Sequence, residues 1–211
     1  LSLRELMIFG TAGLTAGQCL EAIERNGIAP DHGEVVVTGA SGGVGSLAVA
    51  ILTRAGYQVV ASTGKKEARE KLTLLGARRV ISREDVNDTT RKPMLPPAWA
   101  AAIDTVGGNT LSTLVRTIEH GGCVAACGLV GGVDLPLTVY PFILRNVSLL
   151  GIDSAECPLE ARTRIWKKLA GSWKPKHLDS VATEELSLDK LDGAVERILA
   201  KGLHGGQVAN V

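Results

Sequence analysis

The sequence predicts an α/β fold in which a doubly wound, six-stranded parallel sheet is covered by helices on both faces. Short apolar runs rich in β-branched residues alternate along the chain with segments of helical spacing. Glycine is abundant, at 25 of 211 residues, and often stands where a strand or helix would end. Hydrophobic residues make up 45% of the chain and aromatic residues only 3%, which suits a core of small aliphatic side chains.

The first half of the chain predicts a β-α-β-α-β unit. The run VVVT is wholly apolar or β-branched, as expected of a central parallel strand. Glycines follow both predicted helices, at Gly56 and Gly76, and end them. The predicted elements are a strand at 35–38, a helix at 44–55, a strand at 58–62, a helix at 66–75 and a strand at 79–82.

The second half completes the sheet. The charged, proline-containing stretch 83–97 predicts a loop, and Asn109 is expected to cap the next helix, which closes at Gly121 and Gly122. We expect the Rossmann-like strand order 3-2-1-4-5-6. The remaining predicted elements are strands at 101–105, 123–127 and 147–152, and helices near 158–173 and 188–200.

Three regions follow from this order. Residues 1–34 are a helical lead-in whose turns are broken between Gly10 and Gly17, residues 35–155 form the sheet domain, and residues 156–211 are C-terminal helices.

Charge and hydropathy bear on partners and location. The formal net charge of +1 offers no electrostatic support for a nucleic-acid partner. The uncharged stretch 35–53 is nearly long enough to span a membrane, but its clustered glycines predict a strand, a turn and a buried helix instead. No signal peptide is visible at the start. We expect a cytoplasmic protein without a membrane or nucleic-acid partner.

The cysteine and histidine spacings do not predict a metal site. No C-x-x-C pair is present, and the four histidines are scattered. We therefore expect buried, reduced cysteines and no bound metal. The residues concerned are Cys19, Cys123, Cys127, Cys157, His32, His120, His177 and His204.

The glycine-rich segment 38–45 (TGASGGVG) lies between a predicted strand and a predicted helix. Glycine lets the backbone turn sharply and lets a pyrophosphate approach the amides at the helix N-terminus. A tight turn without a ligand would look similar, but the complete six-strand unit favours a dinucleotide site. A P-loop would need Lys after Gly45, where Ser46 stands. A short-chain dehydrogenase would need a Tyr-x-x-x-Lys motif. Neither tyrosine has one, because Ala61 stands four residues after Tyr57 and Leu144 four residues after Tyr140.

The end of the second strand favours NADP over NAD. An NAD site usually has an acidic residue there that accepts from the ribose hydroxyls. Here the strand ends in Ser62-Thr63-Gly64-Lys65-Lys66, and the first carboxylate is Glu67. Ammonium groups suit a 2′-phosphate. Two further glycine corners, at 105–108 and 128–132, follow the fourth and fifth strands and are expected to line the ribose and nicotinamide.

Several segments together resemble the medium-chain dehydrogenase/reductase superfamily. Within it they resemble the zinc-independent, quinone oxidoreductase-like branch that contains the NADPH-dependent acryloyl-CoA reductases. The combination of PFILRNV with GIDS is more specific than the glycine loop. The segments are GTAGLTA at 10–16, VVVTGASGGVGSLAVAIL at 35–52, LGARRVI at 75–81, AAIDTVGG at 101–108, GGCVAACGLVGG at 121–132 and PFILRNVSLLGIDS at 141–154.

The resemblance implies a set of residues that bind NADP(H). One group would hold the pyrophosphate, one the 2′-phosphate, and one would lie beside the nicotinamide. Family members more often have Ser-Gly-Arg where this chain has Thr-Gly-Lys, which keeps the charge but loses the bidentate fork. The three groups are Ser41, Gly42, Gly43 and Val44; Thr63, Gly64 and Lys65 with Arg79 nearby; and Leu129, Ile143 and Ser154.

The resemblance also implies what the chain does. Such proteins carry an N-terminal GroES-like catalytic barrel that this sequence lacks, so no catalytic residue is predicted and the chain alone is expected to be inactive. The implied activity is hydride transfer from NADPH to the C=C of an α,β-unsaturated acyl-CoA such as acryloyl-CoA. A quinone reductase and a non-catalytic NADP-binding or sensing module remain alternatives. The apolar run Val147–Ile152 would be an edge strand, and we expect it to pair across a homodimer.

Overall fold

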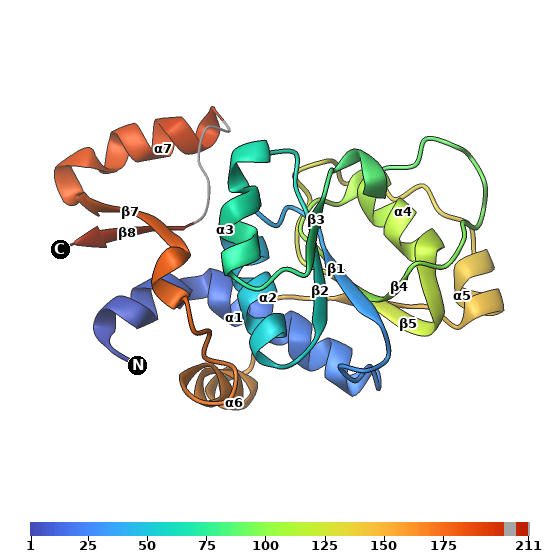
Figure 1. The fold of residues 1–211 in the computed structure, drawn as a ribbon, viewed down its shortest axis with the longest axis horizontal. Helices are drawn as coiled ribbons and strands as arrows, with labels where there is room; N and C mark the ends of the chain where they lie inside the picture. The colour runs from blue at the N-terminus through green and yellow to red at the C-terminus, as the bar shows by residue number, and fades with distance from the viewer. Residues whose placement is uncertain (201–205, 211) are drawn as a thin grey trace.

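The structure is a computed structural model that describes residues 1–200 and 206–210, the side chains of residues 183, 184, 198 and 206–210 excepted. The last residues of the predicted C-terminal region, 201–205 and 211, therefore lie outside the described part. Six parallel strands form the main sheet in the order β3-β2-β1-β4-β5-β6, which confirms the predicted topology (Figure 1). These strands are β1 (Glu34–Val37), β2 (Gln58–Ser62), β3 (Arg79–Ile81), β4 (Trp99–Asp104), β5 (Ile118–Ala126) and β6 (Ser148–Gly151).

Helices cover both faces of the sheet because successive strand residues point to opposite sides. Val35 and Val37 pack in one cluster with side chains of α1, α2, α3 and α6, whereas Val36 packs in another with α4. Figure 1 shows α1, α2 and α3 on one side of the strands and α4 and α5 on the other. The helices are α1 (Leu3–Arg25), α2 (Gly43–Arg54), α3 (Arg69–Leu74), α4 (Gly108–Thr117), α5 (Tyr140–Arg145), α6 (Leu159–Ala170) and α7 (Leu191–Leu199), and short 3-10 turns lie at Lys66–Ala68, Glu84–Val86, Leu178–Ser180 and Leu188–Lys190.

Helix α1 packs against one face of the sheet. Ser2 caps it, accepting from the Glu5 amide while the Glu5 side chain accepts from the Ser2 amide. The helix is interrupted only at Gly10, whose φ of +47° breaks the helical backbone, so the predicted break does not extend to Gly17. By length and hydropathy α1 could span a membrane, but 61% of its apolar window is buried inside the fold, as in the core helix of a globular domain.

Two predictions about local structure are wrong. Asn109 does not cap α4. The helix begins after Gly107, whose φ is +76°, and the Asn109 amide instead donates to Asn87 Oδ1 and the Asp88 carbonyl. Strand β5 begins at Ile118, five residues before the predicted start, because it pairs there with Trp99 of β4.

The sequence pattern also does not reveal a small second sheet. Strands β7 (Ala182–Ser187) and β8 (Gly206–Asn210) pair in parallel and are joined through α7. In Figure 1 this unit lies beside the start of α1, and Arg4 of α1 is ion-paired with Asp179 and Glu185. The first turns of α1 and the C-terminal region are thus held together.

Close packing of α2 on the turn after β1 makes a testable prediction. A Cβ added at Gly45 would lie 2.3 Å from the Gly39 carbonyl oxygen, whereas one added at Gly43 would meet only Ala12 Cβ, at 3.8 Å. Gly45→Ala is therefore expected to lower the free energy of unfolding by about 2 to 4 kcal/mol, because the backbone must separate. Gly43→Ala, the matched control, should change it by less than about 0.5 kcal/mol. Urea unfolding of both variants measures this, and equal stabilities would contradict the packing argument.

Candidate functional site

The loop after β1 presents unpaired backbone amides at the start of α2. Gly39, at φ +57°, reverses the chain, and the Gly42 amide donates to the Gly39 carbonyl at 2.9 Å. Gly42 is the N-cap residue of α2 and has no side chain to cap the helix. The first-turn amides of Gly43, Val44 and Gly45 precede Ser46, whose amide makes the first intrahelical bond, to the Gly42 carbonyl at 3.0 Å, so they have no partner within the helix. Such amides, with the helix dipole, favour a bound anion.

The end of β2 is tied to this loop. The Thr63 hydroxyl donates to Ser41 Oγ at 3.0 Å and accepts from the Lys65 amide at 3.1 Å. The structure therefore brings Ser41, Thr63 and Lys65 together. It also shows that the buried Thr63 hydroxyl joins two loops of the site.

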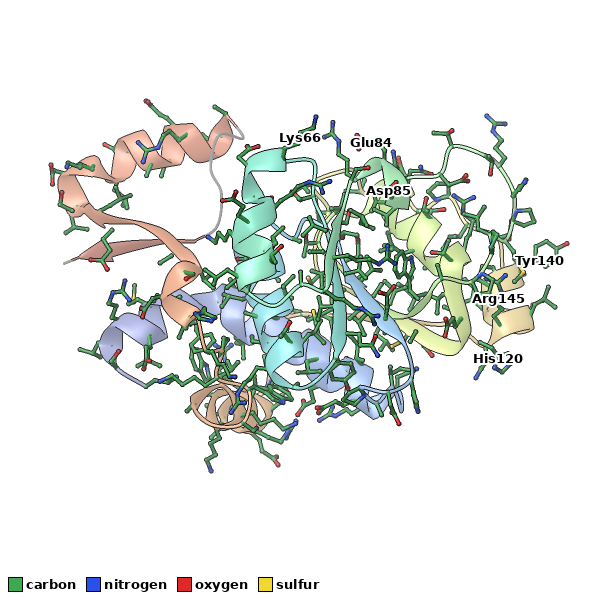
Figure 2. The ribbon with its side chains drawn as sticks, in the orientation of Figure 1. Lys66, Glu84, Asp85, His120, Tyr140 and Arg145 are labelled. Atoms are coloured by element: carbon green, nitrogen blue, oxygen red, sulfur yellow. The ribbon has the colours of Figure 1, made fainter. Side chains whose placement is uncertain are left out.

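Arg83, which the sequence analysis missed, lies over the same corner. A Cβ added at Gly64 would be 3.0 Å from Arg83 Cδ and 3.6 Å from Cζ, so the guanidinium lies against the Gly64 backbone. Its Nε donates to Glu84 at 3.1 Å, and three quarters of its side chain is exposed. In Figure 2 the neighbouring Lys66, Glu84 and Asp85 are grouped along one edge of the molecule. Lysine and arginine thus border the ends of β2 and β3.

The expected role of Arg79 is corrected by the structure. Arg79 is the first residue of β3, at the amino end of the strand. Its guanidinium forms a two-point ion pair with Glu34, with the shorter contact at 2.6 Å, and lies 5.3 Å from the Trp99 ring centre. Both partners begin their own strands. Since the candidate site is at the carboxyl ends, Arg79 does not belong to it.

The two further glycine corners interlock. The Gly131 amide donates to the Val106 carbonyl at 2.7 Å, and Gly107 and Gly132 form an isolated parallel bridge. A Cβ at Gly128 would lie 2.2 Å from the Thr105 carbonyl oxygen, so only glycine allows this approach. The loops after β4 and β5 therefore form one rigid wall of the site.

Of the three residues expected beside a nicotinamide, two share an edge. Leu129, 64% exposed, follows β5, and Ser154 follows the neighbouring strand β6. Ile143 is on a separate element, α5, where 68% of its side chain is exposed. At the end of that helix, the Arg145 guanidinium donates to three backbone carbonyls, those of Leu95, Arg116 and Ile118.

Beneath the site lies a buried carboxylate. Asp104, the last residue of β4, is fully buried and accepts from the Thr38 hydroxyl at 2.6 Å and from the Gly107 amide at 2.7 Å. Burial raises the pKa of this carboxyl, while the hydrogen bonds from Thr38, Gly107 and Val106 oppose the rise.

The thiols near the site are free. Cys127 follows β5, its Sγ lies 3.4 Å from the Asp104 carbonyl oxygen, and a hydrogen bond from Cys19 lowers its thiol pKa. The same contact, with burial, raises the pKa of Cys19. Burial raises the pKa of Cys123 to about 12. Among the described residues, no three or more His, Cys, Asp and Glu side chains are grouped so that they could hold a metal ion.

Taken together, the geometry offers two phosphate-binding positions. The first is the ring of amides at the start of α2, which suits a pyrophosphate. The second is the exposed corner between Lys65 and Arg83, which suits a further phosphate. The interlocked corners after β4 and β5 provide a wall for the remainder of a dinucleotide.

Comparison with protein families and known proteins agrees with this geometry. Residues 43–170 match the family described as zinc-binding dehydrogenase. The chain is 49% identical over 205 residues to the putative quinone oxidoreductase YhfP of Bacillus subtilis, covering 97% of this chain and 62% of that protein. It is 46% identical over 211 residues to the probable acrylyl-CoA reductase AcuI of Escherichia coli, covering 100% of this chain and 64% of that protein.

Solved structures show the same fold with nicotinamide cofactors bound. The crystal structure of Bacillus subtilis yhfP with NAD bound superposes with a TM-score of 0.97 at 48% identity, over 100% of this chain and 64% of that one. The structure of Escherichia coli K-12 yhdH with bound NADPH superposes with a TM-score of 0.94 at 45% identity, over 99% of this chain and 64% of that one. The chain thus spans slightly less than two thirds of the length of these relatives.

Proposed function

Since the chain belongs to the zinc-binding dehydrogenase family, with the quinone oxidoreductase-like fold of the medium-chain dehydrogenase/reductases, we propose that it is the NADPH-binding domain of a reductase. The observation that carries the proposal is the unpaired first turn of α2, opened to an anion by Gly42 and Gly43. A side chain at either position would occupy the space that a pyrophosphate needs. Ser41, Gly42, Gly43 and Val44 would border the pyrophosphate, and the first-turn amides of Gly43 and Val44 would donate to it.

The basic corner supports NADP(H) as the cofactor. Lys65 and Arg83 place positive charge beside Gly64. In the sequence that follows β2, Glu67 is the first residue with a carboxylate side chain. A 2′-phosphate would gain charge-assisted hydrogen bonds there. A relative with NADPH bound supports this choice, and another with NAD bound indicates that the loop itself accepts either cofactor.

When bound, the cofactor supplies the hydride, and the chain's own residues position it. Leu129, Ile143 and Ser154 would line the nicotinamide side. We propose reduction of the C=C of an α,β-unsaturated acyl-CoA, such as acryloyl-CoA, because two relatives at 46% and 42% identity are named acrylyl-CoA reductases. A quinone is the second candidate substrate, because the relative at 49% identity is named a quinone oxidoreductase.

The proposal assigns no catalytic residue and no zinc to this chain. These 211 residues are proposed to bind NADPH without turning over substrate by themselves. Its four free thiols suit the reducing cytoplasm, where we place it.

The free edge of β6 supports a homodimer. In the described sheet β6 pairs only with β5, and the segment 130–144 that precedes it carries exposed apolar side chains. Pairing with a second copy would cover the free edge. The apolar residues are Val130, Val133, Val139, Ile143 and Leu144.

Calorimetric titration with NADPH tests the main proposal. The wild-type chain should bind NADPH, and Gly43→Val should reduce its affinity at least about a hundredfold, because the branched side chain blocks the pyrophosphate. Gly43→Ala, whose Cβ has room in the fold, shows how much of the loss is due to bulk. Absence of NADPH binding by the wild-type chain would refute the proposed function, and unchanged affinity in Gly43→Val would refute the role of the loop.

The basic corner makes a separate prediction about cofactor choice. Lys65→Asp and Arg83→Ala should each weaken NADPH binding by about tenfold or more while changing NADH binding less than about threefold. Lys176→Asp, at an exposed lysine after α6, is the charge-matched control and should change neither affinity. Titration with both cofactors measures the difference. Equal loss of NADPH and NADH binding would contradict the 2′-phosphate assignment.

The dimer is tested by sedimentation velocity. The wild-type chain should sediment at twice its 22.1 kDa mass. Leu144→Lys, which places a charge in the exposed apolar segment before β6 at a side chain 59% exposed, should shift the equilibrium to monomer. Leu3→Lys, at an exposed leucine on α1, should remain dimeric. A monomeric wild-type chain would contradict the assignment.

A further inference from the structure

We propose that Asp104 is a positioning residue for the cofactor. Its buried side chain and backbone hold three glycine corners of the site in register: the glycine loop at 38–45 and the corners at 105–108 and 128–132. The inference rests on the proposed function, since it concerns how this chain shapes its NADPH site. Asp104 is fully buried at the carboxyl end of β4 and touches no solvent. It therefore acts through the loops around it and not by contact with the cofactor.

The side chain of Asp104 links the first two corners. Thr38, at the start of the glycine loop, donates its hydroxyl to Asp104 Oδ1 at 2.6 Å and accepts from the Thr105 amide at 3.2 Å. Because this hydroxyl accepts from Thr105, its single proton is available for the carboxylate. Asp104 Oδ2 accepts from the Gly107 amide at 2.7 Å. One carboxylate thus fixes the loop after β1 against the corner after β4.

The backbone of the same residue links the third corner. The Asp104 carbonyl accepts from the Cys127 amide at 2.9 Å, one residue before Gly128. Gly128 in turn approaches the Thr105 carbonyl too closely for any side chain. All three loops that would border a dinucleotide are therefore positioned by Asp104 and its neighbour Thr105.

The charge of Asp104 favours this role over a simple packing role. Asp104 takes part in none of the ion pairs found among the described side chains, so only hydrogen-bond donors compensate its burial. A buried carboxylate without a cation destabilises a core unless its acceptors are filled. Here they are filled by the Thr38 hydroxyl and backbone amides of the site. A neutral side chain would pack as well but would not order these donors.

The substitution Asp104→Asn predicts a specific mismatch. If the remaining side-chain oxygen accepts from the Thr38 hydroxyl, the new side-chain NH₂ group faces the Gly107 amide, and two donors oppose each other. If the side-chain amide is turned the other way, the Thr38 hydroxyl loses its acceptor. Either arrangement moves one corner relative to another, so the site loses its shape although the volume of the side chain is kept.

NADPH affinity measured on folded variants tests the proposal. Asp104→Asn and Thr38→Val should each weaken NADPH binding about tenfold or more, and Thr38→Ser, which keeps the hydroxyl, should recover most of the loss in Thr38→Val. Thr53→Val is the matched control. It removes a comparable hydrogen bond, from the Thr53 hydroxyl to the Gly76 carbonyl at 3.1 Å, away from the site, and should leave NADPH affinity within about twofold.

Hydrogen exchange of the wild-type chain gives a reading that does not depend on whether a variant folds. NADPH should slow exchange of the Thr105 and Gly107 amides together with those of Gly43 and Val44, by about tenfold or more. The Gly76 amide, which follows α3 and lies next to Thr53 at the far end of α2, should be unaffected. Protection confined to the first turn of α2, or variants that unfold more easily yet bind NADPH normally, would overturn the proposal. A wild-type chain that does not bind NADPH would instead overturn the proposed function itself.

Discussion

Strands β1 and β4 are neighbours in the sheet, yet the chain leaves them in opposite directions. After β1 it crosses to β2 on one side, and after β4 it crosses to β5 on the other. The backbone ladder sets the spacing of the two strands as far as Thr38, whose amide donates to the Ile103 carbonyl at 3.0 Å. Beyond that point the two chains diverge, so side chains must hold the loops together. The hydrogen bond from Thr38 to Asp104 does this below the crevice that the reversal of strand order creates. The glycine loop, the two interlocked corners and the start of α2 all depend on that spacing.

Most of the sheet could be predicted because its signal is local. Val35, Val36 and Val37 place apolar side chains on both faces of the strand, and glycines mark where helices end. The second sheet could not be predicted in this way. The segment ATEELS at Ala182–Ser187 is short, contains two carboxylates and has no alternation, so only its pairing with β8 makes it a strand. The predicted cap of α4 was wrong for a similar reason. Gly107 at positive φ starts the helix early, and the Asn109 amide is then needed by the neighbouring loop.

The candidate site divides along the same line. The glycine loop was predictable because its residues are contiguous and stand between a strand and a helix. The basic corner was only half predictable, since three arginines, Arg78, Arg79 and Arg83, lie around β3. Which of them reaches the site depends on the direction of the strand. β3 runs from Arg79 to Ile81, so Arg79 is at the amino end with Glu34, while Arg83 follows the carboxyl end. Applying the carboxyl-end rule to the predicted strand at 79–82 would have selected Arg83.

The glycine loop and the basic corner would have separate tasks: binding the pyrophosphate and discriminating between NAD and NADP. The amides at the start of α2 would bind a pyrophosphate that NAD and NADP share, so they add affinity without discrimination. Discrimination between NAD and NADP would fall to the corner between Lys65 and Arg83, which an exposed guanidinium borders on one side. Arg83 is already paired with Glu84, so a 2′-phosphate would have to compete with a carboxylate for the same fork. Lys65 offers a point charge and no second fork. A site built this way would bind the dinucleotide through its backbone and select the phosphate through two side chains, so cofactor preference could change without rebuilding the loop.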